Sequence, residues 1–161
     1  MISKLFYAIL LTLMPITELR AGLPLAISYA LEKDIPVFFI FILIISLNIL
    51  VIFFVFYFLD KIHSYLMRIN FYKKIFNKFL KRFRKKVDKF EEKNGKTWFW
   101  ALVFFVAVPL PGTGAWSGCL LAWILDLDRK KSIVAISLGV IIAGIIVLFG
   151  SLGFIKLFNV L

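Results

Sequence analysis

Two opposite charges, Glu18 and Arg20, stand two residues apart in the stretch "PITELRAGLP" (residues 15–24, the first motif), with apolar runs on both sides. A carboxylate can carry a proton, and a guanidinium can hold a phosphate or a carboxylate through two parallel hydrogen bonds. Ionisable groups in so apolar a segment indicate a site for protons and an anionic substrate. The alternative is a structural role, in which the two charges neutralise one another or bind backbone groups that the broken helices leave unpaired.

A similar stretch, "PLPGTG" (residues 109–114, the second motif), interrupts another apolar run. Because proline ends helices and glycine permits tight turns, both motifs are expected to form the tips of broken helices. Pro15 and Pro24 are expected to stop helices, and Gly22 to loosen the turn between them. The residues assigned to the tip backbone are Pro15, Gly22, Pro24, Pro109, Pro111, Gly112 and Gly114.

Each motif is also expected to begin a short helix. Thr17 is placed to cap a helix that begins at Glu18, and Thr113 or Gly114 is placed to start the return helix of the second motif. A helix start offers free N–H groups and partial positive charge, which suits an anion. Thr17 and Thr113 therefore join Glu18 and Arg20 as the predicted substrate- and proton-binding residues.

Two long uncharged runs determine the class of protein. Residues Ile35–Leu59 and Ser132–Ile155 carry no charge, and each exceeds the roughly 20 apolar residues that cross a bilayer. Of the 161 residues, 62% are hydrophobic, against about half in soluble domains. The sequence therefore predicts an all-α integral membrane protein. Its apolar N-terminal run is expected to remain in the mature chain, because no small-residue cleavage site follows it.

The chain contains an internal repeat with an offset of 94 residues. Residues 15–34 align with residues 109–128, so that Pro15 matches Pro109 and the ending "YALEKD" matches "WILDLD". Each copy follows a short apolar run and precedes a long one. We therefore expect two repeats, 1–59 and 97–161, each consisting of a helical hairpin and a transmembrane helix.

The apolar arms beside each motif are about 10–12 residues long and reach only about halfway through a bilayer. Two arms could form one broken span or a re-entrant hairpin. With hairpins, 16 of the 20 Lys and Arg residues lie on one side, which the positive-inside rule favours. The number of crossings between the halves is then odd, so the repeats are inverted and their tips meet near the midplane.

A basic segment, residues 60–96, joins the two halves and holds 13 of the 20 Lys and Arg residues. Its apolar residues recur at steps of three and four, as on one face of a helix. Such a basic amphipathic helix is expected to lie on the anionic cytoplasmic surface of the membrane. A dimerising coiled coil is the alternative, and nucleic-acid binding is disfavoured.

Other polar and small residues are expected to serve packing. Asn48 is expected to face a neighbouring helix, Cys119 to fill space, and the glycines of the last apolar run to allow close helix contacts. Those glycines are Gly139, Gly144, Gly150 and Gly153. With a single histidine and a single cysteine, we expect no metal site, no cofactor and no disulfide. The absence of a catalytic set of residues argues against an enzyme.

The two motifs resemble those of the small multidrug export protein family, and the resemblance covers nearly the whole chain. That family is similar to the DedA superfamily (SNARE-associated, VTT-domain), which has paired re-entrant hairpins. The resemblance implies proton-dependent translocation of phospholipids or of a polyprenyl phosphate. Glu18, Gly22 and Pro24 resemble the acidic first loop of the superfamily, but at a different spacing. The second motif lacks the arginines of the Arg–Pro–Gly–Arg-like second loop.

The function expected from the sequence is proton-coupled translocation of an amphipathic anion, such as a lipid or polyprenyl phosphate. Arg20 would hold the headgroup and Glu18 the proton. Proton-coupled efflux of hydrophobic cations and a non-transporting scaffold remain as alternatives. The expected location is the plasma (inner) membrane of a prokaryote, with a cytoplasmic linker and both termini outside. The expected partners are membrane lipids and protons, and a homodimer stays open.

Overall fold

The computed structural model describes residues 3–15, 17–66, 97–110 and 112–158, and these residues form helices joined by short turns. Most of the basic segment, residues 67–96, lies outside the described residues, and so does Pro111. The prediction of an amphipathic surface helix therefore stays a prediction beyond residue 66.

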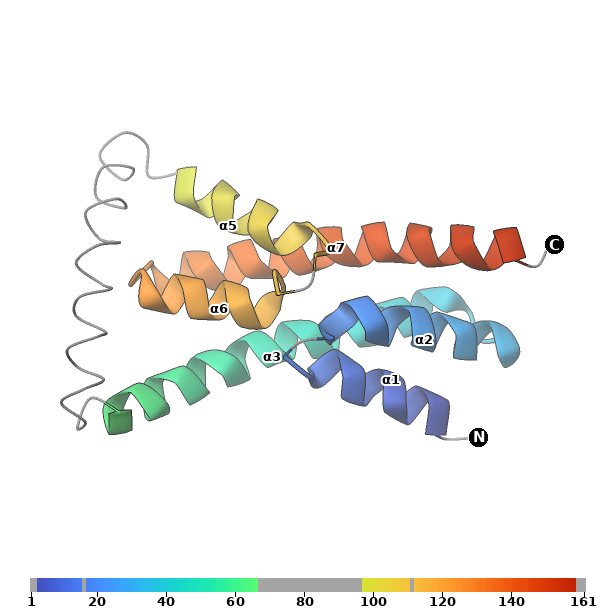
Figure 1. Cartoon of the computed structure of the whole chain (residues 1–161), viewed down its shortest axis with the longest axis horizontal. Helices are drawn as coiled ribbons and strands as arrows, with labels where there is room; N and C mark the ends of the chain where they lie inside the picture. The colour runs from blue at the N-terminus through green and yellow to red at the C-terminus, as the bar shows by residue number, and fades with distance from the viewer. Residues whose placement is uncertain (1–2, 16, 67–96, 111, 159–161) are drawn as a thin grey trace.

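The described helices fall into two groups of three along the chain (Figure 1). The first group is α1 (Ser3–Leu13), α2 (Glu18–Glu32) and α3 (Val37–Leu66). The second group is α5 (Thr97–Ala107), α6 (Ala115–Ile124) and α7 (Arg129–Phe158). Each group consists of two short helices followed by a helix of 30 residues.

Helices α1 and α2 form an antiparallel pair, because Lys4 near the start of α1 forms an ion pair with Glu32 at the end of α2. Gly22 lies within α2 and faces α1. A Cβ at Gly22 would overlap the hydroxyl of Thr12 and come within 2.7 Å of the carbonyl oxygen of Ala8. The prediction that Gly22 loosens a turn is therefore wrong, since this glycine permits close helix packing instead.

Pro24 also lies inside α2, which continues to Glu32. The prediction that Pro24 stops the helix is therefore wrong. Proline has no N–H to donate to the carbonyl four residues earlier, that of Arg20, so this helical bond is missing. The helix persists because Leu23, Ala26 and Ile27 on its other face are fully buried in the core.

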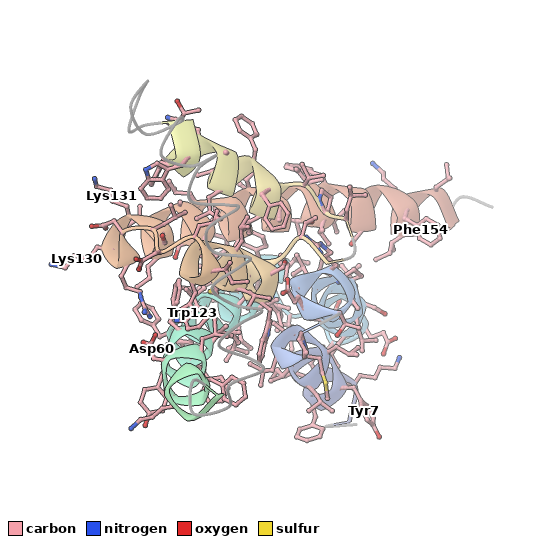
Figure 2. All side chains as sticks on the ribbon, turned by 60° about the vertical axis from the view of Figure 1, so that its left-hand side comes forward. Tyr7, Asp60, Trp123, Lys130, Lys131 and Phe154 are labelled. Atoms are coloured by element: carbon pink, nitrogen blue, oxygen red, sulfur yellow. The ribbon has the colours of Figure 1, made fainter. Side chains whose placement is uncertain are left out.

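The two long helices run in opposite directions, and the end of α3 lies beside the start of α7 (Figure 1). There Asp60 accepts hydrogen bonds from Arg129 at 2.9 and 3.1 Å and from the indole N–H of Trp123 at 2.9 Å. Figure 2 shows Asp60 near Trp123, with Lys130 and Lys131 extending outward at the same end. Because α3, α6 and α7 all contribute, this cluster ties the two groups of helices together.

Helices α2 and α6 are followed by the same backbone turn. Asp34 and Asp126 adopt left-handed conformations, with φ of 53° and 55°. In both turns the residue after the aspartate donates its N–H to the carbonyl five residues before that donor, at 2.9 and 3.0 Å. The equivalent aspartates are thus 92 residues apart, so the sequence alignment that paired Asp34 with Asp128 is wrong by two residues here.

The glycines of α7 fall into two classes. A Cβ at Gly139 or Gly144 would collide with side chains of α5 or α3, so these two residues permit close packing, as predicted. A Cβ at Gly150 or Gly153 would meet no atom within 4 Å. The packing prediction is therefore wrong for Gly150 and Gly153, which leave open space beside α7.

Candidate functional site

The two motifs meet in the middle of the molecule. In Figure 1 the turn between α1 and α2 and the loop between α5 and α6 approach each other from opposite ends. Pro15 lies in the first turn, and Pro109 lies in the loop. In the same loop Gly112 has a φ of 84°, a conformation that glycine adopts without strain.

Glu18 links the first motif to the start of α6. Its side chain is buried, and its two carboxylate oxygens accept the backbone N–H groups of Ala115 and Trp116, at 3.1 and 3.0 Å. These are two of the free N–H groups that every helix start presents. Because Gly114 has no side chain, the carboxylate can approach this closely; a Cβ there would overlap it. The anion at the start of α6 is therefore a side chain of the protein itself.

The backbone of Glu18 is held in an unusual conformation. Its φ is 46°, in the left-handed region that non-glycine residues rarely adopt. Such a conformation costs on the order of 1–3 kcal/mol and persists only where surrounding contacts enforce it. The two hydrogen bonds to α6 are contacts of this kind, so the tertiary arrangement determines where the carboxylate points.

Arg20, which is partly buried in α2, reaches the second motif. Its Nη2 atom donates to the carbonyl of Val108 at 3.1 Å and to the hydroxyl of Thr113 at 2.8 Å. Its Nε and Nη1 atoms are buried and have no hydrogen-bond partner within the described residues. The guanidinium is therefore fixed by Val108 and Thr113, and its remaining donors are unpartnered within the described residues but covered by the protein.

Glu18 and Arg20 do not pair with each other in the described part of the chain. Each instead binds groups of the second half, with the carboxylate at the start of α6 and the guanidinium just beyond the end of α5. The carboxylate lies at the N-terminal end of α6, which is partially positive, and the guanidinium lies beyond the C-terminal end of α5, which is partially negative. Each charge is therefore stabilised by the dipole of the helix that it contacts. The two charges therefore do not neutralise one another by direct contact. Each binds backbone groups at a helix break, as the other form of the structural alternative predicted.

The structure tests the helix-start roles predicted for Thr17 and for Thr113 or Gly114. Thr17 does occupy the N-cap position of α2, but its hydroxyl donates to the carbonyl of Leu11 at 2.7 Å and makes no capping bond. The predicted cap is therefore absent, and Thr17 satisfies the end of α1 instead. Thr113 lies beside Arg20, and Gly114 rather than Thr113 is the N-cap of α6.

The sequence did not identify the backbone groups that hold the two charges. The carbonyl of Val108 and the N–H groups of Ala115 and Trp116 carry no side-chain signal, and only the predicted helix start after the second motif pointed to them. Asn48 lies near the first motif, buried in α3, and donates to the carbonyl of Thr12 at 3.4 Å. It faces a neighbouring helix, as predicted.

Comparison with known families adds to this geometry. A sequence model of the family described as "Putative small multi-drug export protein" matches residues 18–146. The chain belongs to this family. No curated protein and no solved structure matches the chain significantly. The matched range begins at Glu18 and includes Arg20 and the whole second motif.

This member of the small multi-drug export family is a helical membrane protein. Residues Val37–Lys61 of α3 and Arg129–Leu157 of α7 are long and apolar enough to cross a bilayer, with mean hydropathies of 3.1 and 2.9. Helices Thr97–Ala107 and Ala115–Ile124 are apolar but shorter. Large apolar side chains cover the outer faces of both long helices, for example Phe53, Phe54 and Phe149.

Proposed function

We propose that this protein is a small transporter that moves an amphipathic anion, such as a lipid phosphate or polyprenyl phosphate, across the plasma membrane with a proton. The observation that supports it best is the guanidinium of Arg20, which has two buried donors without partners within the described residues. Buried donors are costly unless they are satisfied. A phosphate oxygen could accept from either donor, but the N–H of Nε and those of Nη1 point from different edges of the guanidinium, so each donor needs an acceptor of its own.

The proposed topology is an inverted repeat of re-entrant hairpins. Helices α1, α2, α5 and α6 are 11, 15, 11 and 10 residues long, so none exceeds about 23 Å and none spans the roughly 30 Å hydrocarbon layer. The hairpins open toward opposite ends of the molecule (Figure 1), which fits tips that meet near the midplane. The basic segment then lies in the cytoplasm and both termini lie outside.

Glu18 is the proposed proton carrier, and its contacts suggest how a proton would act. An ionised carboxylate accepts hydrogen bonds at both oxygens, as the contacts with Ala115 and Trp116 require. When Glu18 is protonated, one of its oxygens becomes an O–H donor. That O–H then faces a backbone N–H, which is also a donor, so the hydrogen bond between them is weakened. Protonation would therefore loosen the link between the two motifs, which are the elements that must separate for alternating access.

Efflux of hydrophobic cations is the second candidate, because it fits the description of the family. A cation would need the negative charge of Glu18, but both carboxylate oxygens already accept backbone N–H groups. Arg20, by contrast, keeps unpaired donors within the described residues. The contacts of the site therefore favour an anion. A scaffold without transport activity would need neither charge.

Transport in proteoliposomes separates these three functions. We would measure uptake of a radiolabelled short-chain prenyl phosphate and of a hydrophobic quaternary ammonium probe, with and without a pH gradient. We expect phosphate uptake that the gradient stimulates and that Arg20→Gln and Arg20→Lys both reduce. Lys130→Gln is the matched control, because it removes an exposed positive charge at the N-terminal end of α7, outside both motifs. Uptake of the ammonium probe alone would support efflux, and uptake of neither would support a scaffold.

A further inference from the structure

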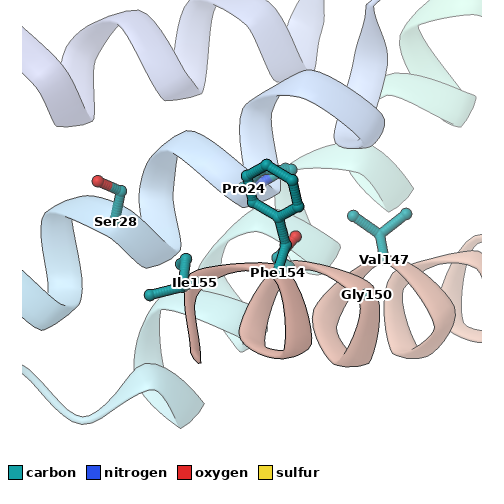
Figure 3. Close-up of a pocket in the computed structure, with 7 residues that line it drawn as sticks. Pro24, Ser28, Val147, Gly150, Phe154 and Ile155 are labelled. Carbon is teal, nitrogen blue, oxygen red and sulfur yellow. The ribbon is translucent and has the colours of Figure 1, made fainter. Parts of the chain in front are cut away.

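An open apolar groove lies between α2 and the C-terminal half of α7 (Figure 3). Its volume is about 490 Å³. The residues that line it include Pro24, Ser28, Val147, Gly150, Phe154 and Ile155. The α7 side of the groove lies beyond the range that the family model matches. In the view of Figure 3 the ring of Phe154 overlaps Pro24, and both residues line the groove.

The groove begins one helical turn from Arg20. Arg20, Pro24 and Ser28 are spaced by four residues and therefore follow one face of α2. From Arg20 to Ser28 this face rises by about 12 Å. An elongated molecule with its charged group at Arg20 can thus extend its apolar part along α2 and α7 without leaving the protein surface.

Gly150 gives the groove its depth. A Cβ at this position would meet no atom within 4 Å, so a side chain here would project into the groove rather than into the protein. Gly153 is equally open but does not line the groove. The absence of a side chain at Gly150 is therefore not needed for packing within the protein, and it leaves space for something else.

The lining of the groove suits a hydrocarbon chain, because it is almost entirely apolar and one of its walls belongs to a helix long enough to cross a bilayer. Lipid tails are themselves apolar, so an apolar groove alone gives little affinity in a bilayer. Selectivity must come from the charged end. Arg20 does not line the groove and its two unpartnered nitrogens are buried, so the side chain must shift for an anionic group to reach them.

We infer that this groove binds the hydrocarbon chain of the membrane amphiphile whose anionic group contacts Arg20. The inference rests on the proposed function and extends it, because it assigns the α2–α7 groove as the path of the substrate chain. The occupant is one chain of an anionic amphiphile, with its inner end at Pro24 and its outer end beside Ser28 and Ile155.

Photo-crosslinking of the full chain in phosphatidylcholine nanodiscs tests this inference. The probe is tetradecyl phosphate with a diazirine near the end of its chain, and labelled peptides are identified by mass spectrometry. We expect labelling within residues 147–155 of α7. Gly150→Leu should reduce it by roughly fivefold or more, because the added side chain fills the space that a closely packed chain would occupy. Gly153→Leu is the matched control and should label as the wild type does.

The outcomes separate the groove from the headgroup site. Equal labelling of wild type and Gly150→Leu, or equal losses in Gly150→Leu and Gly153→Leu, would overturn the groove. Unlabelled tetradecyl phosphate should compete with the probe, and tetradecyl trimethylammonium should not. If labelling depends on Gly150 but Arg20→Gln leaves both labelling and competition unchanged, the groove stands and the proposed anion site fails.

Discussion

Replacement of Glu18 by glutamine tests the link between the two halves most directly. The carboxylate accepts two backbone N–H groups at the start of α6, at 3.1 and 3.0 Å. Glutamine keeps one acceptor oxygen, but its NH₂ group then faces the other N–H, so one hydrogen bond is lost and the remaining one is no longer charge-assisted.

The size of the effect follows from these two bonds. A hydrogen bond to a charged group contributes about 1.5–3 kcal/mol, and a neutral one contributes about 0.5–1.5 kcal/mol. The loss of one charged bond and the weakening of the other give a destabilisation of about 2–4 kcal/mol. For a chain of this size, that corresponds to a fall in Tm of roughly 4–16 °C.

The assay is thermal unfolding of the purified protein in detergent, with Glu32→Gln as the matched control. Glu32 ends the same helix, but its carboxylate is about half exposed in an ion pair with Lys4. Such exposed pairs contribute about 0–1 kcal/mol, so the control should unfold within a few degrees of the wild type. If Glu18→Gln unfolds at the same temperature as Glu32→Gln, the capping role of Glu18 is refuted.

The double variant Glu18→Gln with Arg20→Gln extends this test to the relation between the two charges. For a buried pair, removal of both partners should restore stability, because neither charge is left alone. Here the two side chains bind different groups of the second half, although their charges attract each other at longer range. We therefore expect the double variant to be at least as unstable as Glu18→Gln. Wild-type stability in the double variant would show that the two charges are a structural pair.

Further predictions concern topology and packing. Single cysteines at Glu32 and Lys130, in a cysteine-free background, should react with a membrane-impermeant thiol reagent from opposite sides of the membrane; labelling from the same side would exclude inverted hairpins. Gly22→Ala should lower stability by about 1–3 kcal/mol in thermal unfolding, because its Cβ overlaps α1. Gly153→Ala, which meets no neighbouring atom, should not. Gly112→Ala should cost about 1–2 kcal/mol, because its φ of 84° is left-handed.

The sequence alone predicted the helical class and the order of the elements. Runs of uncharged residues such as Ile35–Leu59 need no tertiary information, because their length relative to the bilayer is sufficient. The breaks around Pro15 and Pro109 could also be predicted from the local sequence, because proline has no N–H to bond to the preceding helical turn. The helix start at Glu18 was also predicted, and it agrees with the structure.

Local rules failed where a neighbouring helix changed the balance. Proline in isolation predicts a stop at Pro24, but the buried face of α2 keeps the helix intact. Glycine predicts a turn at Gly22, but contact with α1 requires a residue without a side chain there. Gly139 and Gly150 are also indistinguishable in sequence, and only their surroundings separate a packing residue from an open groove.

The contacts of the two charges were decided by the tertiary structure. The sequence placed Glu18 and Arg20 two residues apart and left open whether they pair. Apart from the hydroxyl of Thr113, their partners are backbone groups about 90 or more residues away, such as the carbonyl of Val108 and the N–H of Ala115. Backbone groups are the same in every residue, so no residue type marks them. Only the packing of one helix end against another brings these groups within reach of the two side chains.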